Sequence, residues 1–306
     1  MGIPRGSARL LLEEHKRQPF GGTVLQFGRS TVYFTHEELR AWAGAHGVTL
    51  RDVETRLSHD PRLAAEQCID DHTLFESLGF DRVTSSDIEE WEGADYIFDL
   101  NESVPEDLEG QFDVVFETGT SVQIFHLPNV LTNIYKLLKP GGRVVHAAVP
   151  SNNHMDLGFY MLCPTFFSDY YAANGWQIDS HYLCEYYAYW YRGRLYSDTW
   201  DIYQYEPGCL DGLSYGRYGG KQAATFLVAT KADEATSGVN PFLGQYRQTW
   251  QEFSESGGEG AAGLKQDDVA RQSEPGGALG RVAKRMAETV RRRFLPRPMP
   301  RRVARY

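Results

Sequence analysis

Acidic and glycine residues recur at the ends of short apolar segments along this chain of 306 residues. In chain order they are Gly28, Asp87, Asp99 with Leu100 and Asn101, and the run Glu117, Thr118 and Gly119. A glycine lets a ligand approach the backbone, and a carboxylate at a strand end can accept hydrogen bonds from both hydroxyls of a ribose. A further carboxylate can accept from the amine of adenine. A single Asp at such a position more often caps a turn, so the indication of nucleoside binding depends on the whole set.

These residues can act together only if the segments before them lie side by side. Strands are expected at 23–27, 81–87, 94–101, 112–120, 143–150, 176–191 and 222–232. Amphipathic helices are expected to begin after Thr35, at Asp60-Pro61, at Pro128 and at Cys163, and the second is expected to continue to Gly79. Strands that alternate with helices predict a parallel α/β sheet, and such sheets bind ligands at their carboxyl edge.

The series of motifs resembles the class I S-adenosylmethionine-dependent methyltransferases. The matching stretches are VLQFG (24–28), SSD (85–87), FDLN (98–101), FDVVFETGT (112–120) and LLKPGGRVVHAAVP (137–150). The spacing from Asp113 to Gly142 is similar to the broad type 11/12 group, and residues 150–176 resemble a bacterial branch of it. The resemblance covers roughly residues 20–232. It implies a Rossmann-like seven-stranded sheet with helices on both faces, whose last strand, around 224–230, is antiparallel.

The resemblance also implies S-adenosyl-L-methionine as the cofactor, held by the strand-end residues named above. Asp87 is expected at the ribose, and Asp99, Leu100 and Asn101 are expected at the adenine. Gly28 and the loop 117–119 are expected to border the rest of the cofactor. The expected reaction is methyl transfer to a hydroxyl or amine of a small molecule or glycan.

Removal of a proton from the acceptor is expected of a histidine in the loops after the fourth and fifth strands. His154 is the first candidate and His126 the second, because an imidazole of ordinary pKa can take a proton at neutral pH. The alternative for each is an exposed loop histidine without a role. Tyr160 is expected to orient the acceptor. No metal is expected, since the nine histidines show no metal-ligand spacing.

Several positions depart from the pattern of the resembled family. Gln26 replaces the usual acid, and Ser30 replaces the second glycine of the first loop. Val122 and Gln123 stand where relatives often carry Glu-His, and Leu157 stands where a His is expected. These changes favour an alternative function, a catalytically degenerate binding or assembly protein with this fold. The acids at strand ends favour the enzyme.

Charge and composition exclude several classes of protein. The net charge is −10, yet residues 281–306 carry ten Lys or Arg against one acid, so the rest of the chain is at −19. So acidic a body disfavours nucleic-acid binding, which needs a basic surface. Four cysteines without a C-x-x-C pair indicate reduced thiols, and no apolar run is long enough to span a bilayer. A cytoplasmic protein is expected.

Four regions are expected along the chain. They are an exposed lead-in (1–19), the methyltransferase-like domain (20–232), a glycine-rich flexible linker (233–280) and a basic amphipathic tail (281–306). In the tail, Val282, Met286, Val290 and Phe294 recur at helical spacing among basic residues. Such a helix suits an anionic membrane surface. A solubilising tail, or a helix that docks on the acidic body, is the alternative.

Overall fold

The computed structural model describes residues 2–187, 199–210, 220–244 and 300–306. By contacts the chain divides into two compact units. The first comprises Met1–Glu206, Tyr218–Asn240 and Arg301–Tyr306, and it contains the sheet and all the helices named below. The second, Pro207–Arg217 and Pro241–Pro300, lies largely outside the described residues.

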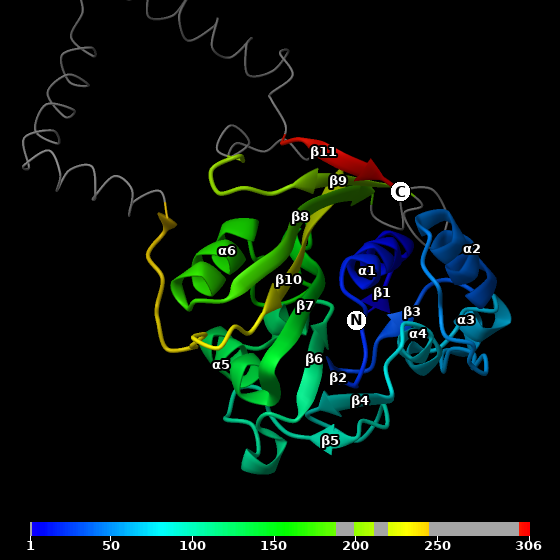
Figure 1. The fold of residues 1–306 in the computed structure, drawn as a ribbon, viewed down its shortest axis with the longest axis horizontal. Helices are drawn as coiled ribbons and strands as arrows, with labels where there is room; N and C mark the ends of the chain where they lie inside the picture. The colour runs from blue at the N-terminus through cyan, green and yellow to red at the C-terminus, as the bar shows by residue number, and fades with distance from the viewer. Residues whose placement is uncertain (1, 188–198, 211–219, 245–299) are drawn as a thin grey trace, which may run out of the picture. The chain divides into compact units, whose positions relative to one another are not determined.

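A mixed sheet of nine strands forms the centre of the first unit (Figure 1). In spatial order the strands are β11 (Arg302–Arg305), β9 (Trp200–Gln204), β8 (Gln177–Tyr187), β10 (Lys221–Thr230), β7 (Leu138–Asn152), β6 (Phe112–Glu117), β2 (Thr23–Phe27), β4 (Arg82–Asp87) and β5 (Tyr96–Ile97). A separate parallel pair joins β1 (Gly2–Ile3) to β3 (Thr31–Val32). The sheet confirms the expected α/β class.

Strand direction follows the expectation for seven of these strands. The run β5-β4-β2-β6-β7 is parallel throughout. β10 is antiparallel to both of its neighbours, β7 and β8. The expected antiparallel strand around 224–230 is therefore confirmed. The sheet is larger than expected, because β9 and β11 extend it beyond β8 as two further antiparallel strands.

Helices cover both faces of the sheet (Figure 1). They are α1 (Arg5–Arg17), α2 (His36–His46), α3 (Pro61–Ala65), α4 (Asp71–Ser77), α5 (Leu127–Leu137) and α6 (Pro164–Ala173), with short 3-10 turns η1 (Glu106–Leu108) and η2 (Thr120–Gln123). Residues of α1, α2 and α4 share one buried apolar cluster with the sheet. Residues of α5 and α6 share the other. Two cores, one on each face, hold the strands in place.

Local sequence sets the boundaries of several elements. β6 is buried along nearly its whole length, and it accordingly reads as an almost continuous apolar run. α2 begins with the expected capping box: the Glu38 backbone N–H donates to Thr35 Oγ1 over 3.1 Å, and the Thr35 N–H donates to Glu38 Oε2 over 2.9 Å. α5 has Pro128 in its first turn, where a missing N–H costs nothing.

Residues 1–19 belong to the folded unit, which corrects the expectation of an exposed lead-in. They contain α1, in which Leu10–Leu12 are at most 2% exposed. Glu14 is buried as well and accepts a hydrogen bond from the hydroxyl of Ser180 on β8. The basic and acidic residues that border these leucines concealed the apolar face of the helix in the sequence.

The single helix expected from Asp60 to Gly79 is two short helices, α3 and α4. Gln67 adopts a left-handed backbone with φ of +62°, which ends the first helix. Cys68 and Ile69 then form isolated β-bridges before a new helix starts. Asp70 caps that helix, because its Oδ1 accepts from the Thr73 N–H over 2.7 Å.

The expected linker and tail are also partly folded. Ala235 is buried, and the Trp176 indole donates to the Thr236 carbonyl over 2.9 Å, so the folded unit continues to residue 240 rather than ending at 232. The last residues of the expected basic tail, beyond the helix expected over 281–294, form β11. Residues 245–280 of the linker and the amphipathic segment 281–294 lie outside the described residues.

Candidate functional site

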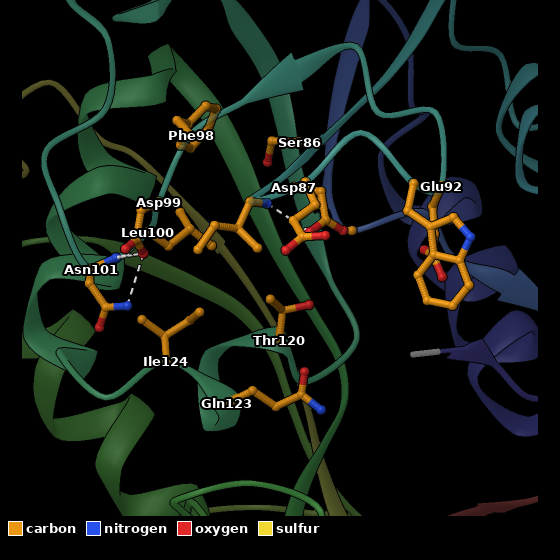
Figure 2. Close-up of a pocket in the computed structure, with 14 residues that line it drawn as sticks. Ser86, Asp87, Glu92, Phe98, Asp99, Leu100, Asn101, Thr120, Gln123 and Ile124 are labelled. Carbon is orange, nitrogen blue, oxygen red and sulfur yellow. Dashed lines mark hydrogen bonds between the residues drawn. The ribbon is translucent and has the colours of Figure 1, made fainter.

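A cavity of about 540 Å³ opens at the carboxyl ends of β2 and β4 and beside the segments that follow β5 and β6 (Figure 2). Its lining residues are Gly28, Ser86, Asp87, Ile88, Glu89, Trp91, Glu92, Phe98, Asp99, Leu100, Asn101, Thr120, Gln123 and Ile124. Five of the residues predicted from the sequence, Gly28, Asp87, Asp99, Leu100 and Asn101, therefore meet in one cavity. A volume of this size suits a small molecule or cofactor.

Gly28 leaves the floor of the cavity open between two polar side chains. Its φ is +74°, and a Cβ added there would lie 3.7 Å from Asp87 Oδ2 and 4.0 Å from Thr120 Oγ1. Asp87 Oδ1 accepts from the Ile88 N–H over 2.7 Å, so Oδ2 is the oxygen on the glycine side. Thr120 is held by a 2.6 Å hydrogen bond from its hydroxyl to the Phe27 carbonyl. This arrangement can accept hydrogen bonds from a ligand that lies over Gly28.

A second polar group forms the wall that follows β5. Asp99 Oδ1 accepts from both the backbone and the side-chain N–H groups of Asn101, over 2.8 and 2.9 Å (Figure 2). Both bonds use one oxygen, so Oδ2 can accept from a ligand. The Leu100 carbonyl accepts from the side chains of Asn129 and Asn133 on α5, over 3.1 and 3.2 Å. α5 thus fixes the segment that presents the second carboxylate.

The strand order and the cavity together decide the fold. Five parallel strands, one antiparallel strand inserted beside the last of them, and a cavity at the carboxyl ends of the parallel strands are the features that the resemblance implies. The fold is that of a class I methyltransferase.

Comparison with solved structures finds methyltransferases of different substrates. The chain is 16% identical to the 1,6-didemethyltoxoflavin-N1-methyltransferase of Burkholderia thailandensis, over 74% of this chain and 77% of that one, with a TM-score of 0.36. A geranyl diphosphate methyltransferase is 15% identical to the chain, over 74% of this chain and 85% of that one, with a TM-score of 0.35. The 16S rRNA (adenine(1408)-N(1))-methyltransferase of Catenulisporales acidiphilia is also 15% identical, over 74% of this chain and 94% of that one, with a TM-score of 0.32. No protein-family model and no curated protein matches the chain.

Within this methyltransferase fold, Glu117 does not line the cavity but lies beneath the loop that does. It is 1% exposed, and its Oε2 accepts from the backbone N–H groups of Gly119 and Ser121 over 2.7 and 3.3 Å. Its Oε1 faces His146 Nδ1 at 2.6 Å, and His146 Nε2 faces the Tyr171 hydroxyl at 2.5 Å. Glu117 therefore anchors the loop rather than binding a ligand directly.

Buried charge in this cluster is stabilised by its hydrogen bonds. Burial alone raises the pKa of Glu117, but His146 and the two loop N–H groups outweigh it and hold the pKa below its usual value. Burial raises the pKa of Tyr171 well above its usual value, so the phenol keeps its proton beside His146 Nε2. Neither His146 nor Tyr171 was predicted from the sequence. Thr118 and Gly119 were predicted from the sequence; they lie in the anchored loop but not in the cavity lining.

A second buried network surrounds the chain next to Gly28. Asp71 of α4 is 1% exposed and accepts from Gln26 Nε2 over 3.0 Å. Arg29 donates to both oxygens of Asp71, over 3.2 and 2.5 Å, and the Ser30 N–H donates to Gln26 Oε1 over 3.2 Å. Burial raises the pKa of Asp71, but the bonds to Arg29 and Gln26 lower it below its usual value. A carboxylate from α4 thus lies beside the position where the resembled family carries its acid.

The three candidate catalytic residues lie outside the cavity lining. The His126 backbone N–H donates to Asn101 Oδ1 over 3.0 Å, which links it to the second carboxylate wall. His154 Nε2 lies 3.1 Å from the Tyr186 hydroxyl, and burial lowers the pKa of His154. The Tyr160 hydroxyl donates to the Phe125 carbonyl over 2.7 Å. The structure therefore does not bring these residues to the cofactor cavity itself.

The described ranges of the chain contain neither a metal-ligand cluster nor a membrane-spanning helix. Within them, no group of three or more His, Cys, Asp or Glu side chains is arranged to hold a metal ion. No helix there has the length and apolar character needed to cross a membrane.

Proposed function

We propose that this chain transfers the methyl group of S-adenosyl-L-methionine to a hydroxyl or amine of a small-molecule or glycan acceptor. The observation that carries the proposal is the cavity in which Gly28, Asp87 and Asp99 meet at the carboxyl edge of a methyltransferase-type sheet. Two carboxylates in one cavity, each with one oxygen that accepts no hydrogen bond from the described residues, match the hydrogen-bond donors of an adenosine.

The residues present fit this cofactor. Asp87 Oδ2 would accept from the ribose hydroxyls, and Asp99 Oδ2, with Leu100 and Asn101, would border the adenine. The open floor at Gly28 leaves room for the remainder of the molecule beside Thr120. When bound, the cofactor supplies an activated methyl group; the chain's own part is to orient donor and acceptor and to receive one proton.

His154 is the proposed base, with His126 as the second candidate and Tyr160 as the residue that orients the acceptor. Burial lowers the pKa of His154, so its imidazole is neutral at pH 7 and can take a proton. No metal takes part in this proposal.

Calorimetric titration with S-adenosylhomocysteine tests the cofactor site. The wild-type chain should bind it, and Asp87→Ala should weaken binding by about ten- to a hundredfold, since an unpaired buried ribose hydroxyl costs about 1–3 kcal/mol. Glu90→Ala is the matched control, because Glu90 is an exposed acid on the same loop and does not line the cavity. Absence of binding at millimolar ligand would remove the proposal.

A binding or assembly protein without catalysis is the second candidate. It is favoured by the position of His154, His126 and Tyr160 outside the cavity lining. The two functions separate once an acceptor is found: the enzyme should lose turnover in His154→Ala or His126→Ala and be insensitive to chelator. A chain that binds S-adenosylhomocysteine but methylates none of a broad panel of hydroxyl and amine acceptors supports the second candidate.

Association with an anionic membrane surface through the basic segment remains a prediction from the sequence. Its test must leave the sheet intact, because residues 301–306 contain β11. Deletion of 281–299 alone, rather than truncation at Gly280, is therefore the suitable variant. Co-sedimentation with anionic vesicles should require this segment and weaken with salt. Equal sedimentation of the deleted and complete chains would exclude the membrane role.

A further inference from the structure

Five large apolar side chains are exposed on two loops at the carboxyl edge of the sheet. Phe125 follows η2, and the others follow β7. Their exposed fractions are 71% for Phe125, 78% for Met155, 40% for Leu157, 65% for Phe159 and 41% for Met161. We call these five residues the apolar surface. Single exposed apolar residues are ordinary in proteins, but a contiguous group indicates a binding surface.

Specific contacts join the two loops into one surface. The Phe159 and Tyr160 N–H groups both donate to the Val122 carbonyl, over 2.8 and 3.2 Å. The rings of Phe125 and Phe159 meet edge to face with centroids 5.5 Å apart. A Cβ on Gly158 would lie 2.5 Å from the Val122 carbonyl oxygen, so only glycine permits this approach. The loops are therefore held together, and the apolar surface is a built feature of the fold.

The apolar surface is continuous with the cofactor cavity. Gln123 and Ile124 line the cavity and directly precede Phe125. The Gln123 side chain also donates to the Leu157 carbonyl over 3.2 Å. A molecule that lies on the apolar surface thus lies next to the cavity, where an acceptor must be placed to receive a methyl group.

Charge restricts the kind of molecule that can bind here. Residues 83–135 and 144–187, which supply all of the cavity lining except Gly28 and all of the apolar surface, contain no Lys or Arg. The cavity lining itself includes Asp87, Glu89, Glu92 and Asp99. An anionic group would find no cationic partner on these segments and would be repelled by the carboxylates.

We propose that the methyl acceptor carries an uncharged apolar group, and that Phe125, Met155, Leu157, Phe159 and Met161 hold this group beside the cavity. This inference rests on the proposed function, since it assigns the acceptor side of the same site. It favours a hydrophobic acceptor over an unmodified glycan, and it disfavours acceptors with a carboxylate or phosphate next to the reacting atom.

Two fluorescent probes with the same aromatic body test the inference on the complete chain. N-phenyl-1-naphthylamine is neutral, and 8-anilinonaphthalene-1-sulfonate adds one negative charge to the same framework. The neutral probe should bind saturably. Phe125→Ala and Phe159→Ala should each weaken it by about tenfold, as expected for loss of one aromatic contact. The anionic probe should bind about tenfold more weakly than the neutral one.

Phe242→Ala is the control, because Phe242 is similarly exposed, at 63%, and belongs to neither loop. It should leave probe binding unchanged. Circular dichroism should show that the variants keep the fold, as expected for exposed side chains. Non-saturable binding, equal effects of all three variants, or equal affinity for both probes would overturn the inference.

Parallel titrations with S-adenosylhomocysteine separate this inference from the proposed function. In Phe125→Ala and Phe159→Ala that affinity should change by less than about twofold, because neither residue lines the cavity. Loss of probe binding with intact cofactor binding supports the inference. Absent cofactor binding in the wild type, with saturable probe binding retained, would refute the proposed function and leave the apolar surface as a binding site without a methyl acceptor. The inference would also be overturned if the wild type were a dimer that these variants convert to monomers, since the apolar surface would then join two copies of the chain.

Discussion

Glu117 shows how a buried residue can control a cavity that it does not touch. Its Oε2 accepts from the loop N–H groups of Gly119 and Ser121, and its Oε1 accepts from the Ser121 hydroxyl and faces His146. The loop carries Thr120, which lines the cavity opposite Asp87. A change at Glu117 should therefore alter both stability and ligand binding.

We expect Glu117→Gln to lower the free energy of unfolding by about 1–3 kcal/mol, because one amide oxygen cannot serve both the loop and His146. Affinity for S-adenosylhomocysteine should fall as well, since the position of Thr120 is loosened. Tyr171→Phe is the control: it removes one buried hydrogen bond of the same cluster and leaves the loop anchored. Denaturant unfolding and calorimetry measure the two effects. If both variants weaken ligand binding equally, the loop is not positioned by Glu117.

His181 gives the molecule a specific dependence on pH. It is 4% exposed, and burial, with a smaller effect of His146, lowers the pKa of His181 to about 3. The unfolded chain binds this proton near pH 6.5. The stability that neutral His181 contributes above pH 6.5 is therefore lost as the pH falls toward 3, by up to about 1.4 kcal/mol per pH unit.

His181→Phe should flatten this loss between pH 6 and 4 while keeping a ring beside Tyr205, whose centroid is 4.5 Å away. Urea unfolding at several pH values measures how the free energy of unfolding depends on pH in each protein. An unchanged slope in the variant would show that other groups cause the acid sensitivity of the fold.

At the scale of elements, β11 covers an edge of the sheet that would otherwise be open. The N–H groups of Trp200 and Tyr306 donate to each other's carbonyls over 2.8 and 2.9 Å, and Tyr306 packs against the core beneath α1 and α2. Arg302 and Arg305 lie 3.1 and 3.8 Å from Asp201. Backbone pairing and Tyr306 should matter more than these exposed charges.

Deletion of 301–306 should lower the free energy of unfolding by about 2–5 kcal/mol and promote aggregation through the exposed strand β9. Arg302→Gln combined with Arg305→Gln should cost less than about 1 kcal/mol, since both arginines are more than half exposed. Thermal unfolding and light scattering compare the two. A charge variant as unstable as the deletion would mean that ion pairs, not strand pairing, hold this edge.

Some elements of this fold can be predicted from the sequence, and others cannot. β2 and β6 could be predicted because strands buried on both faces are short, largely apolar segments. β4 has Val83 as its one apolar residue, and it could be predicted from its β-branched residues and the acid that ends it. β9 and β11 could not, because their pairing joins residues about a hundred positions apart and leaves no local pattern. α1 was missed since charged residues border its buried leucines.

The candidate site also contains residues that the sequence predicts and residues that it does not. Gly28, Asp87 and Asp99 each lie at or just beyond the carboxyl end of a strand, so the order of the strands brings them to one edge of the sheet. The pairs Glu117–His146 and Asp71–Arg29 depend on side-chain directions set by packing between elements. No spacing rule predicts such pairs, and the same holds for His154 and Tyr160, which packing places outside the lining.

At the scale of the whole molecule, the distribution of charge should distinguish the two forms of the proposed cofactor. The cavity lining includes four carboxylates and no Lys or Arg. S-adenosylmethionine carries a net charge of +1, whereas S-adenosylhomocysteine is neutral overall. An acidic cavity therefore attracts the methyl donor more than the product, and salt screens only that difference.

Raising the salt from about 0.05 to 0.5 M should weaken binding of S-adenosylmethionine by roughly three- to tenfold and that of S-adenosylhomocysteine by less than about twofold. Glu89→Gln with Glu92→Gln should reduce the difference between the ligands. Calorimetry at the two salt concentrations measures the affinity for each ligand and its dependence on salt. Equal salt dependence for both ligands would show that these carboxylates do not act on the bound cofactor.

The pairing of β11 with β9 also sets an order of events during synthesis of the chain. Tyr203 cannot meet Arg302 until about a hundred further residues have left the ribosome, which takes about 5–20 s at 5–20 residues per second. During this interval β9 presents unpaired backbone groups to its surroundings. The nascent chain is thus expected to need a chaperone, or slow encounter with its neighbours, at this stage more than at any earlier one.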